Sequence, residues 1–190
     1  MRLLDAYLFP VLWIAYLAFW QIMAANVKAT KRLEPAGSRV LRTVLFFAGV
    51  TLLIEPNYLP RVLDWHFLQV GRLSFFVGAA IAAAGLLFSV WARLHLGRNW
   101  SRSVTIKEDH ELIVTGPYAL VRHPIYTGLL TGFLGTAIAT TELRGILAFV
   151  LISASLWTKL RLEEQWMREH FGAPYPSYCQ RVAALVPFLL

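Results

Sequence analysis

The chain has 190 residues, of which 57% are apolar and only 15% are charged, and its mean hydropathy is +0.55. Soluble domains usually carry about 25% charged residues, so this composition excludes an ordinary water-soluble domain and favours a lipid environment. The net charge of +7 does not indicate nucleic-acid binding, because the basic residues fall in short runs between long apolar stretches. The single cysteine, Cys179, excludes an internal disulfide and a cysteine-based zinc cluster.

Five apolar segments follow one another along the chain. They run from about Leu3 to Ala25, Val40 to Leu59, Leu73 to Ala92, Ile125 to Thr141 and Gly145 to Leu162. Each approaches the roughly 20 residues that a helix needs to cross about 30 Å of hydrocarbon. The first is longer than the apolar part of a signal peptide, so we expect it to be retained as a span. Helices satisfy their own backbone polar groups in lipid, and we therefore predict an all-α bundle of about five transmembrane helices.

The distribution of Lys and Arg predicts the orientation of these spans. Most of the 18 basic residues lie in the first connection, the third connection and the C-terminal tail. The opposite side receives only Arg2, Arg61, Arg72 and Arg144. The positive-inside rule then places the N-terminus outside and the C-terminus in the cytosol.

The polar stretches of the second half should meet on the cytosolic side. The connection between the last two spans, Glu142 to Arg144, is so short that these spans must form an antiparallel hairpin. We therefore divide the chain into N-terminal transmembrane helices at 1–92 and a catalytic region at 93–190. A functional site is expected where the loop before span four meets the C-terminal tail.

Three blocks carry the residues of chemical interest. The first runs from Lys107 to Tyr118, the second from Val121 to Gly128 with the order Arg-His-Pro-x-Tyr, and the third is Glu163-Glu164 followed by Phe-Gly-x-x-Tyr-x-x-Tyr. His123 precedes a proline, which keeps its backbone out of the helical region and lets its ring point back into the cytosolic cleft.

Each of these residues also has an ordinary explanation when it is taken singly. His123 could donate to a backbone carbonyl at the start of a helix. Lys159 and Glu163 lie four apart, so a helix puts them on one face, where they could be a surface ion pair. The tyrosines could belong to an interfacial aromatic belt.

In this order and spacing, the blocks resemble the isoprenylcysteine carboxyl methyltransferase family and its bacterial and archaeal relatives, and phospholipid methyltransferases share a weaker form of the pattern. The resemblance covers roughly Leu94 to Pro187. It implies a pocket for S-adenosyl-L-methionine, built from the loop before span four and the C-terminal tail, and no metal. Carried over residue by residue, it assigns cofactor contacts to His110, Glu111, Leu112, Ile113, Tyr118, His123, Pro124, Ile125, Tyr126 and Glu163.

The sequence departs from the family pattern at one important position. The family places an arginine four residues before the glutamate, facing the substrate carboxylate, and this chain has Lys159 there. Lysine keeps the charge but lacks the planar fork that grips a carboxylate, so Lys159 and the nearby Arg161 are both candidates for the catalytic role. The resemblance implies methylation of a lipid-like, prenylcysteine-type carboxylate that enters from the bilayer, here in a bacterial inner membrane.

Three other functions remain open from the sequence. A phospholipid N-methyltransferase would need a base near its amine acceptor, and a cationic Lys159 would be poorly placed. A sterol-type membrane reductase that binds NADPH would call for a larger basic cluster. A non-enzymatic transporter subunit would favour charge buried mid-span, and the third and fourth apolar segments contain none. The physiological acceptor and the oligomeric state are not indicated.

Overall fold

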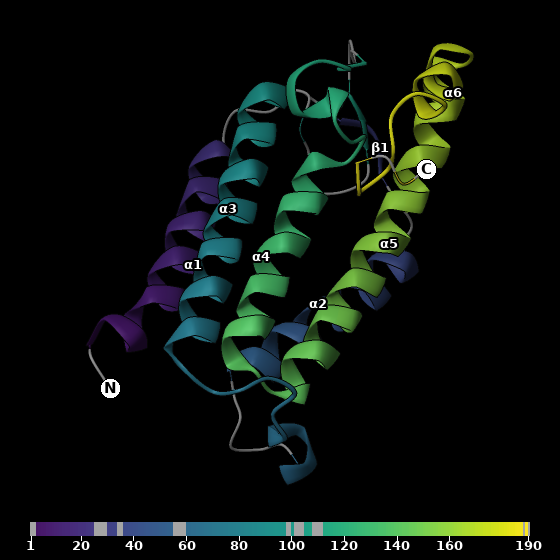
Figure 1. Ribbon diagram of the computed structural model, residues 1–190. Helices are drawn as coiled ribbons and strands as arrows, with labels where there is room; N and C mark the ends of the chain where they lie inside the picture. Colours follow the sequence, from purple (N-terminus) through teal and green to yellow (C-terminus); the bar gives the residue numbers. More distant parts are fainter. Residues whose placement is uncertain are drawn as a thin grey trace.

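The computed structural model describes residues 3–24, 30–33, 36–54, 60–97, 100, 105–107, 112–187 and 189. Within them, five long helices lie side by side in a bundle (Figure 1). They are α1 (Leu3–Met23), α2 (Ala36–Ile54), α3 (Arg72–Leu96), α4 (Pro124–Thr140) and α5 (Leu143–Phe171). Helix α4 packs between α3 and α5, while α1 covers α3 and α2 covers α5.

Four of these helices, α1, α2, α3 and α5, are long and apolar enough to cross a membrane. Helix α4 has 17 residues, which corresponds to about 26 Å, and it lies in the middle of the same bundle. The predicted helical membrane bundle is therefore confirmed. A fifth crossing, by α4, stays a prediction.

Two helices differ from the predicted segments in length. Helix α2 begins at Ala36 rather than Val40, and the predicted end of that segment at Leu59 falls outside the described residues. Helix α5 continues past Leu162 to Phe171 because Glu, Gln, Met and Arg are good helix formers although they are not apolar. Its 29 residues span about 43 Å, more than the hydrocarbon thickness, so its last turns extend beyond the lipid core.

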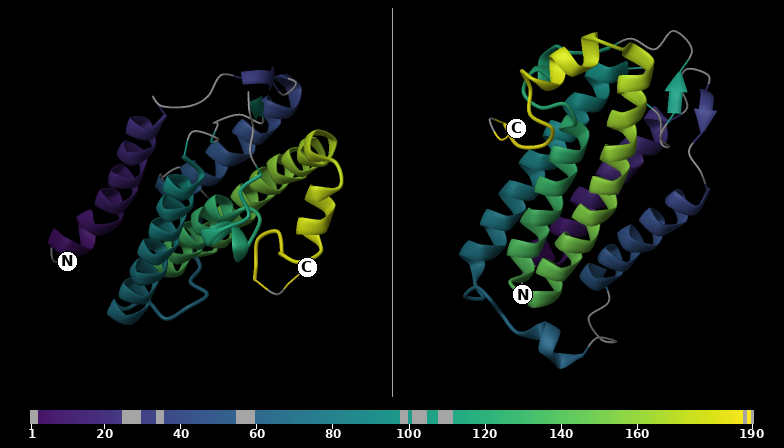
Figure 2. Two further views of the ribbon diagram at one scale, coloured as in Figure 1. Left: turned by 90° about the horizontal axis from the view of Figure 1, so that it is seen from above. Right: turned by 90° about the vertical axis from the view of Figure 1, so that its right-hand side faces the viewer.

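A small two-stranded sheet, which the sequence did not predict, joins two connections. Strand β1 (Thr30–Leu33) pairs antiparallel with β2 (Thr105–Lys107). Strand β1 follows α1 and β2 follows α3, so the pairing brings both basic connections to one end of the bundle, where the short helix α6 (Pro174–Cys179) also lies (Figure 2). The N-terminal end of α1 lies at the opposite end.

Helices α3 and α4 approach each other through glycine. A Cβ placed on Gly85 of α3 would lie 2.6 Å from the carbonyl oxygen of Gly128 on α4, and one placed on Gly78 would lie 2.5 Å from that of Gly135. Backbones in direct contact are typical of small residues spaced along membrane helices. This contact fixes the beginning of α4 against α3.

Helices α2 and α5 are antiparallel, and polar contacts to backbone set their register. Near one end, Arg144 Nη1 donates to the carbonyl oxygens of Leu52 and Leu53 at 3.0 and 3.2 Å. Nearer the other end, Ser155 Oγ donates to the carbonyl oxygen of Arg42 at 2.8 Å. Early residues of α2 therefore face late residues of α5.

The glycine contact gives a first prediction. We expect Gly128→Ala to lower the thermal stability of the detergent-solubilised protein, because the new methyl group would meet the backbone nitrogen of Ser89 at 2.6 Å and overpacking of this kind typically costs about 1–3 kcal/mol. The matched control is Gly37→Ala, where a Cβ would meet nothing within 4 Å. Equal melting temperatures for the two variants would contradict the close approach.

Candidate functional site

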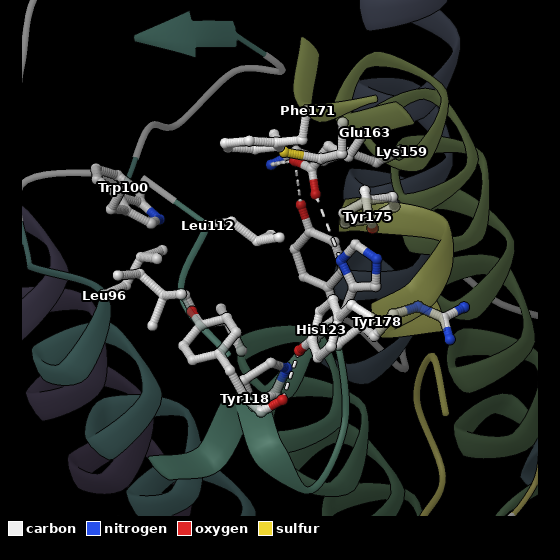
Figure 3. A pocket seen from close by; sticks show the side chains of 16 residues that line it. Leu96, Trp100, Leu112, Tyr118, His123, Lys159, Glu163, Phe171, Tyr175 and Tyr178 are labelled. Carbon is white, nitrogen blue, oxygen red and sulfur yellow. Dashed lines mark hydrogen bonds and ion pairs between the residues drawn. The ribbon is translucent and has the colours of Figure 1, made fainter. Parts of the chain in front are cut away.

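A pocket lies at the end of the bundle that carries the β1–β2 sheet. The segment 112–123, the first turn of α4, the last turns of α5 and the tail with α6 surround it (Figure 3). Its empty volume is about 880 Å³, a figure that includes open solvent at the mouth. The lining residues are Leu96, Trp100, Leu112, Ile113, Tyr118, Arg122, His123, Pro124, Ile125, Tyr126, Lys159, Glu163, Met167, Phe171, Tyr175 and Tyr178.

The loop before α4 takes its shape from glycine and proline. Gly116 has a φ of +59°, which favours glycine, and it opens the short helix η4 (Gly116–Ala119) that buries Tyr118. His123 has a non-helical backbone at φ −122° and ψ 60°, and Pro124 occupies the first position of α4. The expected effect of a proline on the preceding residue is therefore observed.

The C-terminal tail covers this loop through backbone hydrogen bonds. The amide of Arg122 donates to the carbonyl of Ala183 at 2.8 Å, and the amide of His123 donates to Ala184 at 3.0 Å. The tail therefore packs directly against the loop at the pocket.

Two tyrosines extend this contact at the floor of the pocket. The hydroxyl of Tyr178 on α6 donates to the carbonyl oxygen of Tyr118 at 2.5 Å. Burial raises the pKa of both phenols well above the ordinary value, and the same holds for the pKa of Tyr175. These phenols are therefore neutral at physiological pH.

A buried ion pair joins the loop to α5. Arg122 Nε and Nη2 lie 2.8 and 2.7 Å from Glu164 Oε1, and the two side chains are only 10% and 9% exposed. Its Nη1 donates to the carbonyl oxygens of Cys179 and Val182 in the tail. Burial alone would lower the pKa of Arg122, but the hydrogen bond and the charge of Glu164 raise it above its ordinary value. The motif contains Arg122, but the sequence does not predict its pairing with Glu164.

His123 and Glu163 converge in the pocket (Figure 3). Nδ1 of His123 lies 3.7 Å from Glu163 Oε2, and its Nε2 lies 3.4 Å from Glu164 Oε1. The imidazole stacks on Tyr126 with an interplanar angle of 3°, and the Tyr126 hydroxyl donates to Glu163 Oε1 at 2.6 Å. The carboxylate of Glu163 is thus held from one side by the first turn of α4.

The two candidates for the catalytic cation lie in different places. Lys159 Nζ lies 3.9 Å from Glu163 Oε1 and 5.3 Å from the centre of the Tyr126 ring, in the pocket wall. Arg161 is exposed, does not line the pocket, and has its guanidinium carbon 6.0 Å from the centre of the Trp157 ring. Residues two apart on a helix point to different faces, so the structure brings Lys159, and not Arg161, to Glu163.

The opposite wall is apolar and is supported from the first helix. Trp100 lies under the guanidinium of Arg93, with the guanidinium carbon 4.7 Å from the ring centre. Arg93 is fully buried and donates to the carbonyl oxygens of Gly97 and Met23 at 2.7 Å each. The end of α1 thus helps to hold an aromatic wall of the pocket in place.

Most residues that the sequence assigned to the cofactor line the pocket. They are Leu112, Ile113, Tyr118, His123, Pro124, Ile125, Tyr126 and Glu163. His110 and Glu111 lie outside the described residues. Met167 also lines the pocket, whereas its neighbour Trp166 is buried in a separate cluster. The pocket is also lined by Leu96, Trp100, Arg122, Phe171, Tyr175 and Tyr178, none of which was assigned to the cofactor. Arg122 and the last three belong to the quoted blocks, whereas no spacing in the sequence identifies Leu96 or Trp100.

The pocket combines one accessible carboxylate with aromatic walls and an amine. Such a surface suits a ligand with a flat aromatic part and positive charge beside a second, anionic group. Among the described residues, no group of three or more His, Cys, Asp or Glu side chains could hold a metal ion.

Comparisons with known proteins agree on the kind of protein that this chain resembles. The sequence model of the phospholipid methyltransferase family matches residues 73–174, just over half of the chain. The chain is 28% identical to a probable protein-S-isoprenylcysteine O-methyltransferase of Oryza sativa subsp. indica, over 97% of both proteins. It is 26% identical to the protein-S-isoprenylcysteine O-methyltransferase of Saccharomyces cerevisiae, over 75% of this chain and 61% of that protein.

A solved structure supports the fold. The eukaryotic intramembrane Ras methyltransferase, isoprenylcysteine carboxyl methyltransferase, matches with a TM-score of 0.54 and 25% identity. The match covers 83% of this chain and 55% of that one, so this chain spans about half the length of the solved structure. These likenesses confirm the resemblance drawn from the motifs and the integral membrane character of the bundle.

The buried ion pair gives a second prediction. Arg122→Met should destabilise the protein by about 3–5 kcal/mol, because the Glu164 carboxylate would keep its burial and lose its closest cation. Arg168→Met is the matched control, since Arg168 Nη2 lies 3.3 Å from the same carboxylate but the side chain is 55% exposed, and exposed pairs contribute about 1 kcal/mol or less. Thermal unfolding in detergent measures both, and similar losses would contradict the role assigned to Arg122.

Proposed function

Because the chain belongs to the phospholipid methyltransferase family, we propose that it transfers a methyl group from S-adenosylmethionine to the carboxylate of a prenylcysteine-type lipid. The observation that carries this proposal is the meeting of His123, Glu163 and Lys159 in one pocket. The rice relative, named a probable protein-S-isoprenylcysteine O-methyltransferase, matches over nearly the whole chain and supports an oxygen acceptor. The matching solved structure is named an isoprenylcysteine carboxyl methyltransferase, which supports a carboxylate as that acceptor.

The residues of the pocket fit the proposed methyl donor. S-adenosylmethionine supplies an electrophilic methyl group on a positively charged sulfur. Glu163, 20% exposed, offers the negative charge that such a ligand needs, and Trp100, Tyr118 and Phe171 offer aromatic surface for its adenine and its cation. Tyr126 donates a hydrogen bond to the Glu163 carboxylate, and His123 Nδ1 lies 3.7 Å from it.

A carboxylate acceptor needs little acid–base catalysis from the protein. A carboxyl group is ionised at pH 7, so its oxygen can attack without a general base. Lys159 would attract and orient this carboxylate from the α5 wall. The apolar and aromatic walls would exclude water, which otherwise stabilises separated charges more than the charge-dispersed transition state. Positioning and exclusion of water are then the main contributions of the protein.

The position of the pocket in the chain supports the remaining assignments. Each lining residue falls between Leu96 and Tyr178, which supports residues 93–190 as the methyltransferase region and 1–92 as transmembrane helices.

The β1–β2 pairing gathers two basic connections at the pocket end, so we assign this end and the C-terminus to the cytosol and the N-terminus to the outside of a bacterial inner membrane. Helix α4 would be the fifth span. The donor would arrive from the cytosol and the acceptor from the bilayer.

The description of the matched family favours a second candidate, methylation of a phospholipid amine. An amine acceptor must lose a proton, and the nearest carboxylate, Glu163, already accepts a hydrogen bond from Tyr126 and lies beside Lys159. A cationic acceptor next to a lysine is disfavoured by charge repulsion. The geometry therefore favours the carboxylate.

A third prediction tests the donor site. Glu163→Ala and His123→Ala should each weaken binding of S-adenosylmethionine more than tenfold, because the first removes the charge partner and the second removes its support. Calorimetric titration of the purified variants in detergent measures the affinity. Arg161→Ala is the matched control and should bind like the wild type, since Arg161 lies outside the pocket. Unchanged affinity in the first two variants would refute the assignment.

A fourth prediction tests the acceptor. With methyl-labelled S-adenosylmethionine, purified protein should label a prenylcysteine and leave phosphatidylethanolamine unlabelled. Lys159→Met should raise the KM for the prenylcysteine about tenfold or more without weakening donor binding, and Lys159→Arg should restore a low KM because the positive charge returns. Label on phosphatidylethanolamine alone would establish the N-methyltransferase instead.

A further inference from the structure

A buried arginine near the C-terminal end of α3 is not used by the reaction as described so far. Arg93 has an exposed fraction of 0%, although it lies in a helix that is long and apolar enough to cross a membrane, and it does not line the pocket. A charged side chain in such a helix is costly and as a rule serves a site or a partner. The contacts of its guanidinium show what it serves.

The guanidinium joins the ends of two helices. Arg93 Nη2 donates to the carbonyl oxygen of Met23, the last residue of α1, at 2.7 Å. Its Nη1 donates to the carbonyl oxygen of Gly97, directly after α3, at 2.7 Å. The last carbonyls of a helix have no partner within the helix, and hydrogen bonds from a charged donor to such groups are strong. One side chain therefore ties the end of α1 to the end of α3.

The chain turns back over this guanidinium directly after α3. Gly97 has a φ of +58°, which favours glycine, and its carbonyl also accepts a hydrogen bond from the amide of Trp100 at 3.4 Å. The ring centre of Trp100 lies 4.7 Å from the guanidinium carbon of Arg93, within the range of a cation–π contact. Trp100 lines the pocket across from Glu163 (Figure 3). Arg93 is thus in direct contact with a wall of the pocket.

A second indole, from α1, belongs to the same cluster. The ring centre of Trp20 lies 5.0 Å from that of Trp100 and 5.9 Å from the guanidinium carbon of Arg93. Among residues 6–24, which cover α1 after its first turn, only Tyr16 is buried. Helix α1 therefore lies against the bundle through a few specific contacts, and those of its last turn are made to Arg93 and Trp100.

We propose that Arg93 is a positioning residue that holds the Trp100 wall and thereby couples the C-terminal end of α1 to ligand binding in the pocket. The inference rests on the proposed function for the identity of that ligand, the methyl donor. A wall that is already held in its bound orientation spares the ligand the cost of ordering it. By linkage, a donor that packs on Trp100 stabilises the end of α1 as much as that end strengthens donor binding.

A double-mutant cycle on the detergent-purified full chain tests the coupling. Arg93→Met should weaken binding of S-adenosylmethionine about tenfold, and Trp100→Ala should weaken it by at least the same factor. The double variant should bind like Trp100→Ala alone, because Arg93 acts through that ring. Losses that multiply, or unchanged affinity in Arg93→Met, would overturn the inference.

Two further variants separate this role from a general loosening of α1. Trp20→Leu removes the α1 ring from Trp100 and leaves Arg93 in place, so it should also weaken donor binding, but not in the Trp100→Ala background. Tyr16→Phe is the matched control, because it removes the hydroxyl that lies 2.8 Å from Ser89 Oγ of α3. It should lower the melting temperature and leave donor affinity unchanged. Weakened donor binding in Tyr16→Phe would assign the effect to α1 as a whole and overturn the role of Arg93.

Fluorine NMR of protein labelled with 5-fluorotryptophan follows the rings without any ligand. Arg93→Met should shift the resonances of Trp100 and Trp20, which tryptophan-to-phenylalanine variants assign. The resonances of Trp65 and Trp157 should stay in place and show that the bundle is still folded. A Trp100 resonance that does not move would overturn the inference.

The two measurements also separate this inference from the proposed function. A wild type that does not bind S-adenosylmethionine would refute the proposed function, while a shifted Trp100 resonance in Arg93→Met would still establish that Arg93 positions this ring. A shifted resonance together with unchanged donor affinity would refute the coupling and leave the proposed function intact.

Discussion

The site depends on the buried pair of Arg122 and Glu164. The arginine is shared among three parts of the chain, because it lies in the loop, pairs with a carboxylate on α5 and donates to carbonyls of the tail. A buried pair of this kind contributes little net stability compared with apolar packing, but a half-broken pair is strongly unfavourable. The loop, α5 and the tail are thereby selected in one arrangement, in which His123 and Glu163 face the same space.

Around this pair, charge is balanced locally rather than over the whole protein. Glu164 is matched by Arg122, whereas Glu163 faces the pocket with Tyr126 and Lys159 beside it. The two adjacent carboxylates point to different partners because their side chains leave α5 about 100° apart. Glu164 therefore stabilises the arrangement of the loop, α5 and the tail, and Glu163 faces the pocket, where it can contact a ligand.

The sequence predicts the helices well and the site in part, for physical reasons that differ between residues. Hydropathy locates the lipid-facing helices. It places the end of α5 too early, because the last turns of this helix are polar and lie outside lipid. It does not predict the two-stranded sheet of β1 and β2. The motif assigned His123 and Glu163, since proline and helical spacing restrict them locally. Arg161 was placed beside Lys159 by proximity in sequence, whereas helical geometry separates them. Arg122 stood in the motif without a role, because its partners, Glu164 and the carbonyls of the tail, come from distant segments of the chain.

The charge arrangement also bears on the direction of the proposed reaction. A sulfonium donor and a carboxylate acceptor are of opposite charge, so a wall with Glu163 beside Lys159 can hold both at once, each near its own counter-charge. Methyl transfer between them yields a thioether and an ester, and both reacting groups are then neutral. The product sulfur and the product ester carry no charge, so the pocket no longer attracts them electrostatically. The prenyl tail contributes equally to binding before and after the reaction. A site that binds by charge at the reacting centre and by apolar surface elsewhere can therefore release its lipid product into the bilayer from which the acceptor came.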